Sequence, residues 1–287
     1  MSPDPLPLMP SHPKAPAAAK LTWSALTHRG RVRANNEDAF LALTFNAEGL
    51  RFLGKTGEAS LEEGDFVFAV SDGMGGANAG EFASRIAVDK ITRLLPATFR
   101  MTASSFTAGL SDVLLEVFHH VHAEIGKMSI YPECAGMGAT LSLAVFSPGW
   151  MHFAHLGDSR IYYLPKGGQL RQVTEDHSYV GWLRRQGKLN EREARSHPRR
   201  NVLNQALGAG HQIIEPHFGA VSCQAGDRFL LCTDGVVDGL WDDRLWELMT
   251  AAASKAIPRA TRIVELAVSE SGKDNCTAVV VEVAGPK

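Results

Sequence analysis

The stretch DFVFAVSDGMGGANAGE, Asp65 to Glu81, is the part of the chain from which the fold can be read. Phe66 to Val70 is an apolar run of β-formers with the length of a buried strand. The strand is expected to break at Ser71-Asp72-Gly73, and a helix to begin near Glu81. A carboxylate at the end of a buried strand, followed by glycines that let the backbone approach a ligand, can hold a hard cation. On this stretch alone, an ordinary strand-to-helix turn is the preferred interpretation. A cation site is indicated only if other carboxylates are placed in the same way.

Composition limits the class of protein. The 287 residues are 45% hydrophobic and 21% charged, which is ordinary for a soluble globular protein with a substantial core. A net charge of -2 leaves no excess of Lys and Arg to neutralise nucleic-acid phosphates. No apolar run approaches the ~20 residues of a membrane span, and we find no secretory signal pattern. Four widely spaced cysteines without a C-x-x-C pair predict core residues in a reducing cytosol.

The chain is expected to be one catalytic domain preceded by a tail. Residues 1–20 are rich in Pro and Ala and predict a disordered tail, so that the domain covers 21–287. The polar, glycine-punctuated segment 46–64 predicts a loop or hairpin insertion. Apolar residues at three- and four-residue spacing predict helices over Phe106–Ile125, Leu240–Met249 and Ile263–Val268.

Three further carboxylates stand where apolar strands begin or end. Asp158 follows the expected strand Trp150–Leu156, and Asp234 follows Phe229–Leu231. Asp274 immediately precedes the expected final strand Thr277–Val283. Asp and Gly are common turn residues, so coincidence stays open. The four positions nevertheless share the chemistry of an all-oxygen cation site.

Two charged segments have a structural and a functional interpretation. HRGRVRANNEDAF, His28 to Phe40, is either a solvated turn or an anion-binding arginine beside the carboxylates Glu37 and Asp38. The segment Glu175 to Arg200 carries seven basic against four acidic residues. A solvated surface explains most of those charges, and a basic rim that attracts an anionic substrate is the alternative.

Six short motifs occur in a fixed order: R-A-N-N-E-D (Arg33–Asp38), D-G-M-G-G (Asp72–Gly76), G-A-T (Gly138–Thr140), G-D-S-R (Gly157–Arg160), T-D-G-V-V-D (Thr233–Asp238) and D-N (Asp274–Asn275). Together they resemble the successive motifs of metal-dependent serine/threonine protein phosphatases of the type 2C class, the PPM family, in its bacterial form. Each motif is weak alone, whereas six in order are specific. The resemblance covers Leu21 to Val283.

The resemblance implies an α+β fold, a four-layer α-β-β-α sandwich of two antiparallel sheets flanked by helices, with metals at one edge between the sheets. It implies two Mg²⁺ or Mn²⁺ ions per chain and a weaker third position. Asp72 would bridge the two ions, and the carbonyl of Gly73 would also bind. The remaining implied ligands are Asp234 and Asp274 for one ion, Glu37 and Asp38 for the other, directly or through water, and Asp158, Asp234 and Asp238 for the third.

The chemistry suits that ligand set. Oxygen ligands favour Mg²⁺ or Mn²⁺ over zinc, and two such ions can acidify a shared water and aim it at phosphorus. The planar fork of Arg33 matches two phosphate oxygens. The catalytic residues implied are therefore Arg33, Asp38 and Asp72, with Arg33 also binding the substrate.

The proton donor to the leaving group is unassigned. Many eukaryotic members have a histidine, proposed to fill that role, where this chain has Met74. His155, His177 and His197 are candidates by their proximity to motifs, as is a metal-bound water. The flap of the family falls on Tyr179 to Arg200.

The predicted function is hydrolysis of phosphoserine and phosphothreonine on proteins, reversing a bacterial Ser/Thr kinase. We expect a cytoplasmic monomer that binds neither nucleic acid nor membranes. One alternative is a pseudophosphatase that binds phosphoprotein without turnover, against which the complete ligand set argues. The other is a hydrolase of small phosphate esters.

Overall fold

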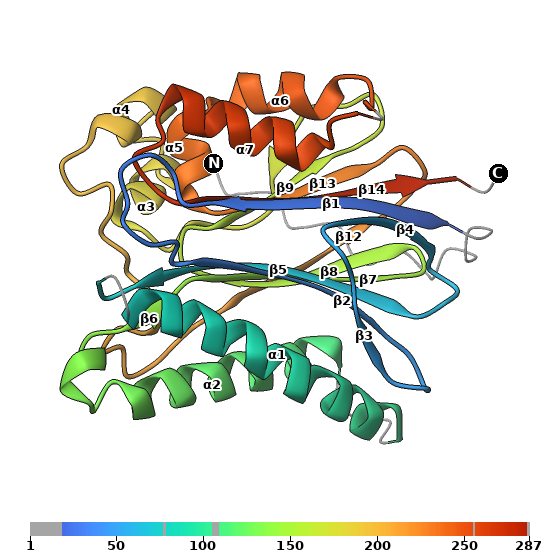
Figure 1. Ribbon diagram of the computed structural model, residues 1–287, viewed down its shortest axis with the longest axis horizontal. Coiled ribbons are helices and arrows are strands. Elements are labelled where there is room, and N and C mark those ends of the chain that lie inside the picture. The colour runs from blue at the N-terminus through green and yellow to red at the C-terminus, as the bar shows by residue number, and fades with distance from the viewer. Residues whose placement is uncertain (1–18, 77–78, 105–108, 255, 286–287) are drawn as a thin grey trace.

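A computed structural model describes residues 19–76, 79–104, 109–254 and 256–285. Two antiparallel sheets pack face to face, and helices cover the outer face of each (Figure 1). This arrangement confirms the predicted α+β sandwich of four layers. The predicted tail lies outside the described residues except for Ala19 and Lys20. Lys20 already belongs to the first strand, where it is paired with Ala284.

The first sheet has six strands, in the order β10 (Arg171–Gln172), β9 (Arg160–Leu164), β13 (Arg228–Cys232), β14 (Cys276–Ala284), β1 (Lys20–His28) and β4 (Thr56–Ser60). β1 and β14 pair along their whole length, from Lys20 opposite Ala284 to His28 opposite Cys276. The loop that leaves β1 therefore lies beside the residues that precede β14, although the two are far apart in sequence.

The second sheet has eight strands. Six form the order β11 (Leu207–Gly208), β6 (Gly138–Ala139), β5 (Asp65–Met74), β7 (Leu141–Ser147), β8 (Trp150–Leu156) and β12 (His217–Ser222), while β2 (Asp38–Phe45) pairs with β5 and β3 (Leu50–Phe52) with β2. The expected break at Ser71 is wrong, because β5 continues to Met74. Its last residues stay in the ladder, since Asp72 is opposite Asp38 and Gly73 is opposite Ala139.

The packing of the core explains why apolar and polar residues do not alternate along β5. Phe66, Phe68 and Val70 point between the two sheets, whereas Val67 and Ala69 point toward the helices below. Both faces of β5 are therefore buried, and a strand buried on both faces reads as a continuous apolar run. Complete burial of side chains of this size contributes about 1.5–3 kcal/mol each, which makes β5 a rigid support for the residues at its end.

The helices form the two outer layers. α1 (Ala79–Ser104) and α2 (Leu110–Met128) cover the second sheet, and α5 (Asp234–Gly239), α6 (Asp242–Thr250) and α7 (Arg259–Glu270) cover the first (Figure 1). The remaining short helices are η1 (Pro132–Cys134), α3 (Tyr179–Arg185) and α4 (Glu191–Ser196). No helix in the described part of the chain is both long and apolar enough to cross a membrane.

Three segments differ from what the sequence predicted. The helix expected from Phe106 is described from Leu110, and residues 105–108 lie outside the described part. The helix expected from Leu240 is preceded by the separate short helix α5, which makes Asp234 a helix residue. Segment 46–64 is no simple hairpin, since β3 joins the second sheet and β4 joins the first.

Candidate metal centre

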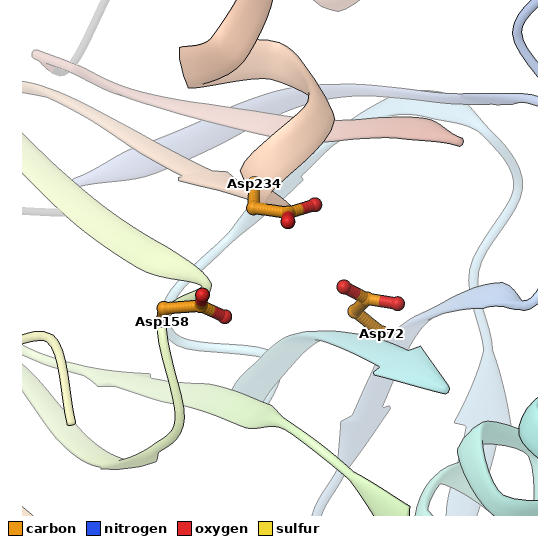
Figure 2. Close-up of side chains that lie close together, drawn as sticks. All are labelled: Asp72, Asp158 and Asp234. Carbon is orange, nitrogen blue, oxygen red and sulfur yellow. The ribbon is translucent and has the colours of Figure 1, made fainter. Parts of the chain in front are cut away.

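Three carboxylates meet at one end of the sandwich. Asp72 comes from β5, Asp158 from the loop after β8, and Asp234 from the start of α5, and one carboxylate oxygen of each lies within 4.8 Å of the others. Figure 2 shows the three side chains directed toward a shared space. The structure thus brings together Asp72 and Asp234, which were expected to bind the two main ions, and Asp158, which was expected at the weaker third position.

The pKa values of all three aspartates are raised above the usual range. Burial, followed by the repulsion from Asp176, raises the pKa of Asp158 to about 7. Burial and the neighbouring carboxylates raise the pKa of Asp72 and Asp234 well above the usual range. Like charges in a buried cluster oppose each other's ionisation unless a cation neutralises them. The electrostatics of the trio therefore favour a divalent cation.

Asp38 has one oxygen in hydrogen bonds and one without a partner. Its Oδ2 accepts the hydroxyls of Thr233 at 2.8 Å and Thr277 at 2.7 Å. Its Oδ1 is buried and has no hydrogen-bond partner among the described residues, and burial raises the pKa of this carboxyl to about 7. A buried orphan oxygen calls for an explanation such as an ion. Asp38 is opposite Asp72 in the ladder, so the oxygen fits a metal site at this edge.

The backbone of Asp72 is clamped by one threonine. Its N–H donates to Thr140 Oγ1 at 3.0 Å, and its carbonyl accepts the N–H of Thr140 at 2.8 Å. The Thr140 hydroxyl also lies 2.6 Å from Ser159 Oγ. Because Ser159 follows Asp158, this chain of hydroxyls fixes the two aspartates relative to each other.

The loop between β1 and β2 is held against the end of β5 and against the residue that precedes β14. The Glu37 N–H donates to Asn275 Oδ1 at 2.7 Å, and the Glu37 carbonyl accepts the N–H of Gly73 at 3.2 Å. A Cβ on Gly73 would lie 1.9 Å from the carbonyl oxygen of Gly80. Only glycine therefore fits where these backbones approach, and burial of the Glu37 carboxyl raises its pKa.

Seven of the nine predicted site residues line one cleft of about 640 Å³: Arg33, Glu37, Asp72, Gly73, Asp158, Asp234 and Asp274. Arg33 and Asp274 form an ion pair in it at 2.6 Å. Asp38 is buried behind the cleft. Arg33 therefore lies beside the carboxylates of the cleft, and the structure leaves open both the solvated-turn and the phosphate-binding interpretation.

Asp238 lies one turn along α5 from Asp234 and is not part of the trio. It lines a neighbouring cavity of about 60 Å³ together with Asp158 and Asp234. Burial raises the pKa of its carboxyl. The three residues expected for a third ion therefore share a cavity, while Asp158 and Asp234 also face the main cleft.

The histidines singled out from the sequence are poorly suited as proton donors. His155 is completely buried, with Nδ1 2.8 Å from Ser142 Oγ and Nε2 3.0 Å from the carbonyl oxygen of Gly157. Burial lowers its pKa to about 3 and that of His177 to about 4. The His177 and His197 Nδ1 atoms accept backbone N–H groups of Gly157 and Arg199. These rings organise loops instead.

Most bases of the predicted flap already have partners, which weakens the basic-rim interpretation. Arg195 pairs with Glu191 at 2.9 Å, and Arg185 pairs with Glu175 at 3.2 Å. The Arg199 guanidinium lies 4.0 Å from the centre of the Tyr179 ring. These contacts use the charges to fold the flap, so fewer remain for an anionic substrate.

Several residues that support or line the site have no role predicted from the sequence: Thr140, Ser159, Thr233, Thr277, Asn275, Asn201 and His211. Thr233 and Asn275 are next to the predicted ligands Asp234 and Asp274 in the sequence, and this position could have marked them as supporting residues. Thr277 reads as an ordinary strand residue. Nothing in the local pattern of Asn201 or His211 marks either one as lining the cleft.

The structure is a four-layer sandwich with carboxylates gathered at one end of its two sheets, where they could hold a metal ion. The family model described as "Protein phosphatase 2C" matches residues 55–266. The chain belongs to the protein phosphatase 2C family, which confirms the resemblance of its motifs.

Three similar proteins illustrate the relationship. The serine/threonine protein phosphatase PstP of Mycobacterium tuberculosis is 34% identical over 92% of this chain, which spans about 45% of that protein's length. The serine/threonine phosphatase stp of Listeria monocytogenes is 34% identical over 89% of this chain and 93% of its own length. A solved structure of the catalytic domain of PstP in complex with two manganese ions superposes with a TM-score of 0.71, at 30% identity over 93% of this chain and 99% of that one.

Proposed function

We propose that this chain hydrolyses phosphoserine and phosphothreonine in proteins with the help of Mn²⁺ or Mg²⁺. The observation that carries the proposal is the trio Asp72, Asp158 and Asp234, within 4.8 Å of one another and in the same cleft as Arg33. Two further observations support it: PstP of M. tuberculosis and stp of L. monocytogenes are serine/threonine phosphatases, and the catalytic domain of PstP has been solved in complex with two manganese ions.

The proposed ligands are those of the sequence analysis, and the orphan oxygen of Asp38 supports them. Two ions would share Asp72, with the Gly73 carbonyl, Asp234 and Asp274 serving one ion and Glu37 and Asp38 serving the other. A weaker third position would use Asp158, Asp234 and Asp238. When bound, such ions neutralise phosphate charge and acidify water.

The chain's own groups would orient the reactants. Arg33 presents two N–H donors in one plane, which match two oxygens of a phosphate. Thr233 and Thr277 hold one oxygen of Asp38, so that the other keeps a fixed direction. Attack of water on phosphorus then releases the seryl or threonyl oxygen, which needs a proton.

We also propose a phosphorylated protein as substrate, a Ser/Thr kinase as the opposing enzyme, and a monomer in the cytoplasm. All four cysteines lie in the described residues and none is in a disulfide, which supports a reducing compartment. The proposal of one catalytic domain over 21–287, with a flap at about 179–200, is supported by α3 and α4 at the end of the sandwich.

The test is turnover of p-nitrophenyl phosphate and of a phosphothreonine peptide, with Mn²⁺ and with EDTA. Release of phosphate from both substrates, dependent on Mn²⁺, is expected. Binding of the peptide without phosphate release would instead identify a pseudophosphatase, and turnover of small esters alone would identify the small-ester hydrolase.

A further inference from the structure

The cleft contains a histidine that the motifs do not include. Among the residues that the structure describes, His211 is the histidine that lines the cleft with Arg33, Asp72 and Asp234. Its side chain is partly exposed, so it can meet both substrate and solvent. Imidazole is the side chain best suited to donate a proton near neutral pH.

The backbone that presents His211 is held in an unusual conformation. Gly208, Ala209 and Gly210 have φ of 69°, 51° and 75°, and Ala209 is the residue without glycine's freedom. A non-glycine residue in this region persists only when its surroundings impose it, and such residues cluster at functional sites. The turn is closed by the His211 N–H, which donates to the Gly208 carbonyl at 3.0 Å.

Hydrogen bonds also fix this turn to the residues before β6 and to α2. The Ala209 N–H donates to the Met137 carbonyl at 2.7 Å, and the Gly208 N–H donates to His122 Nδ1 at 3.1 Å. β11 ends at Gly208 and pairs with β6, which pairs with β5 at Gly73 and Met74. His211 is therefore positioned by the same ladder that positions Asp72 and Gly73.

We propose that His211 donates the proton to the departing seryl or threonyl oxygen, an inference that rests on the proposed phosphatase function. As water oxygen bonds to phosphorus, the P–O ester bond breaks and its electron pair stays on the leaving oxygen. The N–H proton of the His211 imidazolium moves to that oxygen and yields the free alcohol. The neutral ring then regains a proton from solvent, through its exposed side.

The test is the variant His211→Gln on two substrates that differ in their need for a proton. A threonyl alkoxide is a poor leaving group, so kcat for a phosphothreonine peptide should fall by about 10²-fold or more. p-Nitrophenolate leaves without protonation, so turnover of p-nitrophenyl phosphate should be retained. His120→Gln is the matched control, because His120 is an exposed histidine of α2 paired with Glu116 and should change neither rate.

Two further measurements separate catalysis from structure. Calorimetric Mn²⁺ titration and the melting temperature should be the same in His211→Gln and the unmodified chain. The imidazole NMR signals of His211 should shift when a non-hydrolysable phosphonate peptide binds. His211→Asn repeats the test if the first variant does not fold.

Equal loss on both substrates, or no loss on either, would overturn the assignment of His211. An unmodified chain that turns over neither substrate would instead refute the proposed function, and the role of His211 with it. Only loss confined to the phosphothreonine peptide supports the proposal.

Discussion

Arg33 Nη2 donates to Asp274 Oδ2 at 2.6 Å, across 241 positions of sequence. The pair joins the arginine expected to bind phosphate to a carboxylate expected to bind metal. The two side chains are 49% and 27% exposed, so the pair adds little to stability. If Asp274 binds a metal ion as proposed, the cation would compete with Arg33 for the carboxylate and leave the guanidinium available to a phosphate.

Arg33→Ala should weaken phosphate binding more than it affects folding. Hydrogen bonds to charged groups contribute about 1.5–3 kcal/mol, so kcat/KM should fall about 10- to 100-fold. A rise in KM alone would assign Arg33 to binding, and a fall in kcat would show that it also stabilises the transition state. Arg93→Ala is the control, since Arg93 lies on α1 in an exposed pair with Asp89. Unchanged kinetics in Arg33→Ala would return the residue to a solvated turn.

Asp72→Asn should abolish turnover while the protein stays folded. Asn keeps the shape of the side chain and the clamp by Thr140, which acts on the backbone of residue 72, but it removes the charge that a shared ligand of two ions needs. Steady-state kinetics, Mn²⁺ titration and the melting temperature measure the three effects. Full activity in this variant, or activity that EDTA leaves unchanged in the parent chain, would contradict a centre with two ions.

In the metal-free protein, the buried acidic cluster should become increasingly destabilising as the pH rises from about 4 to about 7. The carboxyl groups of Asp38 and Asp158 have pKa values raised to about 7 in the folded chain, against 3.8 for ordinary Asp. Within that window the folded state keeps protons that the unfolded state releases. These two groups therefore lower the free energy of unfolding as the pH rises, by up to ~1.4 kcal/mol per pH unit for each extra proton bound. The buried rings of His155 and His177, whose pKa values are lowered to about 3 and about 4, oppose this change below about pH 6.5.

Urea unfolding of the chelated protein near pH 5 and near pH 8 measures this slope. Asp158→Asn should make the slope shallower, because one of the titrating groups is removed. Saturating Mn²⁺ should remove the loss at high pH, since metal binds the ionised carboxylates. Because the buried histidines titrate in the parent chain and in the variant alike, the comparison of the two isolates the carboxyl group, and an unchanged slope in Asp158→Asn would contradict the charge cluster.

Asp158→Ala should stay folded and still bind two ions tightly, yet lose most activity even in excess Mn²⁺. Its carboxylate is held in the trio with Asp72 and Asp234, so its removal relieves repulsion and should not destabilise the metal-free fold. Calorimetric metal titration beside kinetics decides the matter. Normal turnover with a lower melting temperature, equivalent to a loss of ~0.5–3 kcal/mol, would make Asp158 a structural turn residue.

The six motifs, through the family that they resemble, were sufficient to predict the four layers and most of the residues that line the cleft. The apolar run from Phe66 to Val70 indicated a buried strand, and the helical spacing over Val113 to Ile125 indicated a helix with one apolar face, as the structure has them. These patterns are local, because the burial of each residue is set by the period of its own element. The order of the six motifs added the family and the acidic residues that face the cleft.

The tertiary structure decided which of those residues touch. The trio, the hydroxyls on Asp38 and the pair of Arg33 with Asp274 all depend on the pairing of strands far apart in the chain. Local periodicity does not encode which distant strands pair, or in which register, because that choice depends on how complete sheets pack together. The position of His211 in the cleft also depends on the pairing of distant strands, because β11 pairs with β6 and β6 pairs with β5.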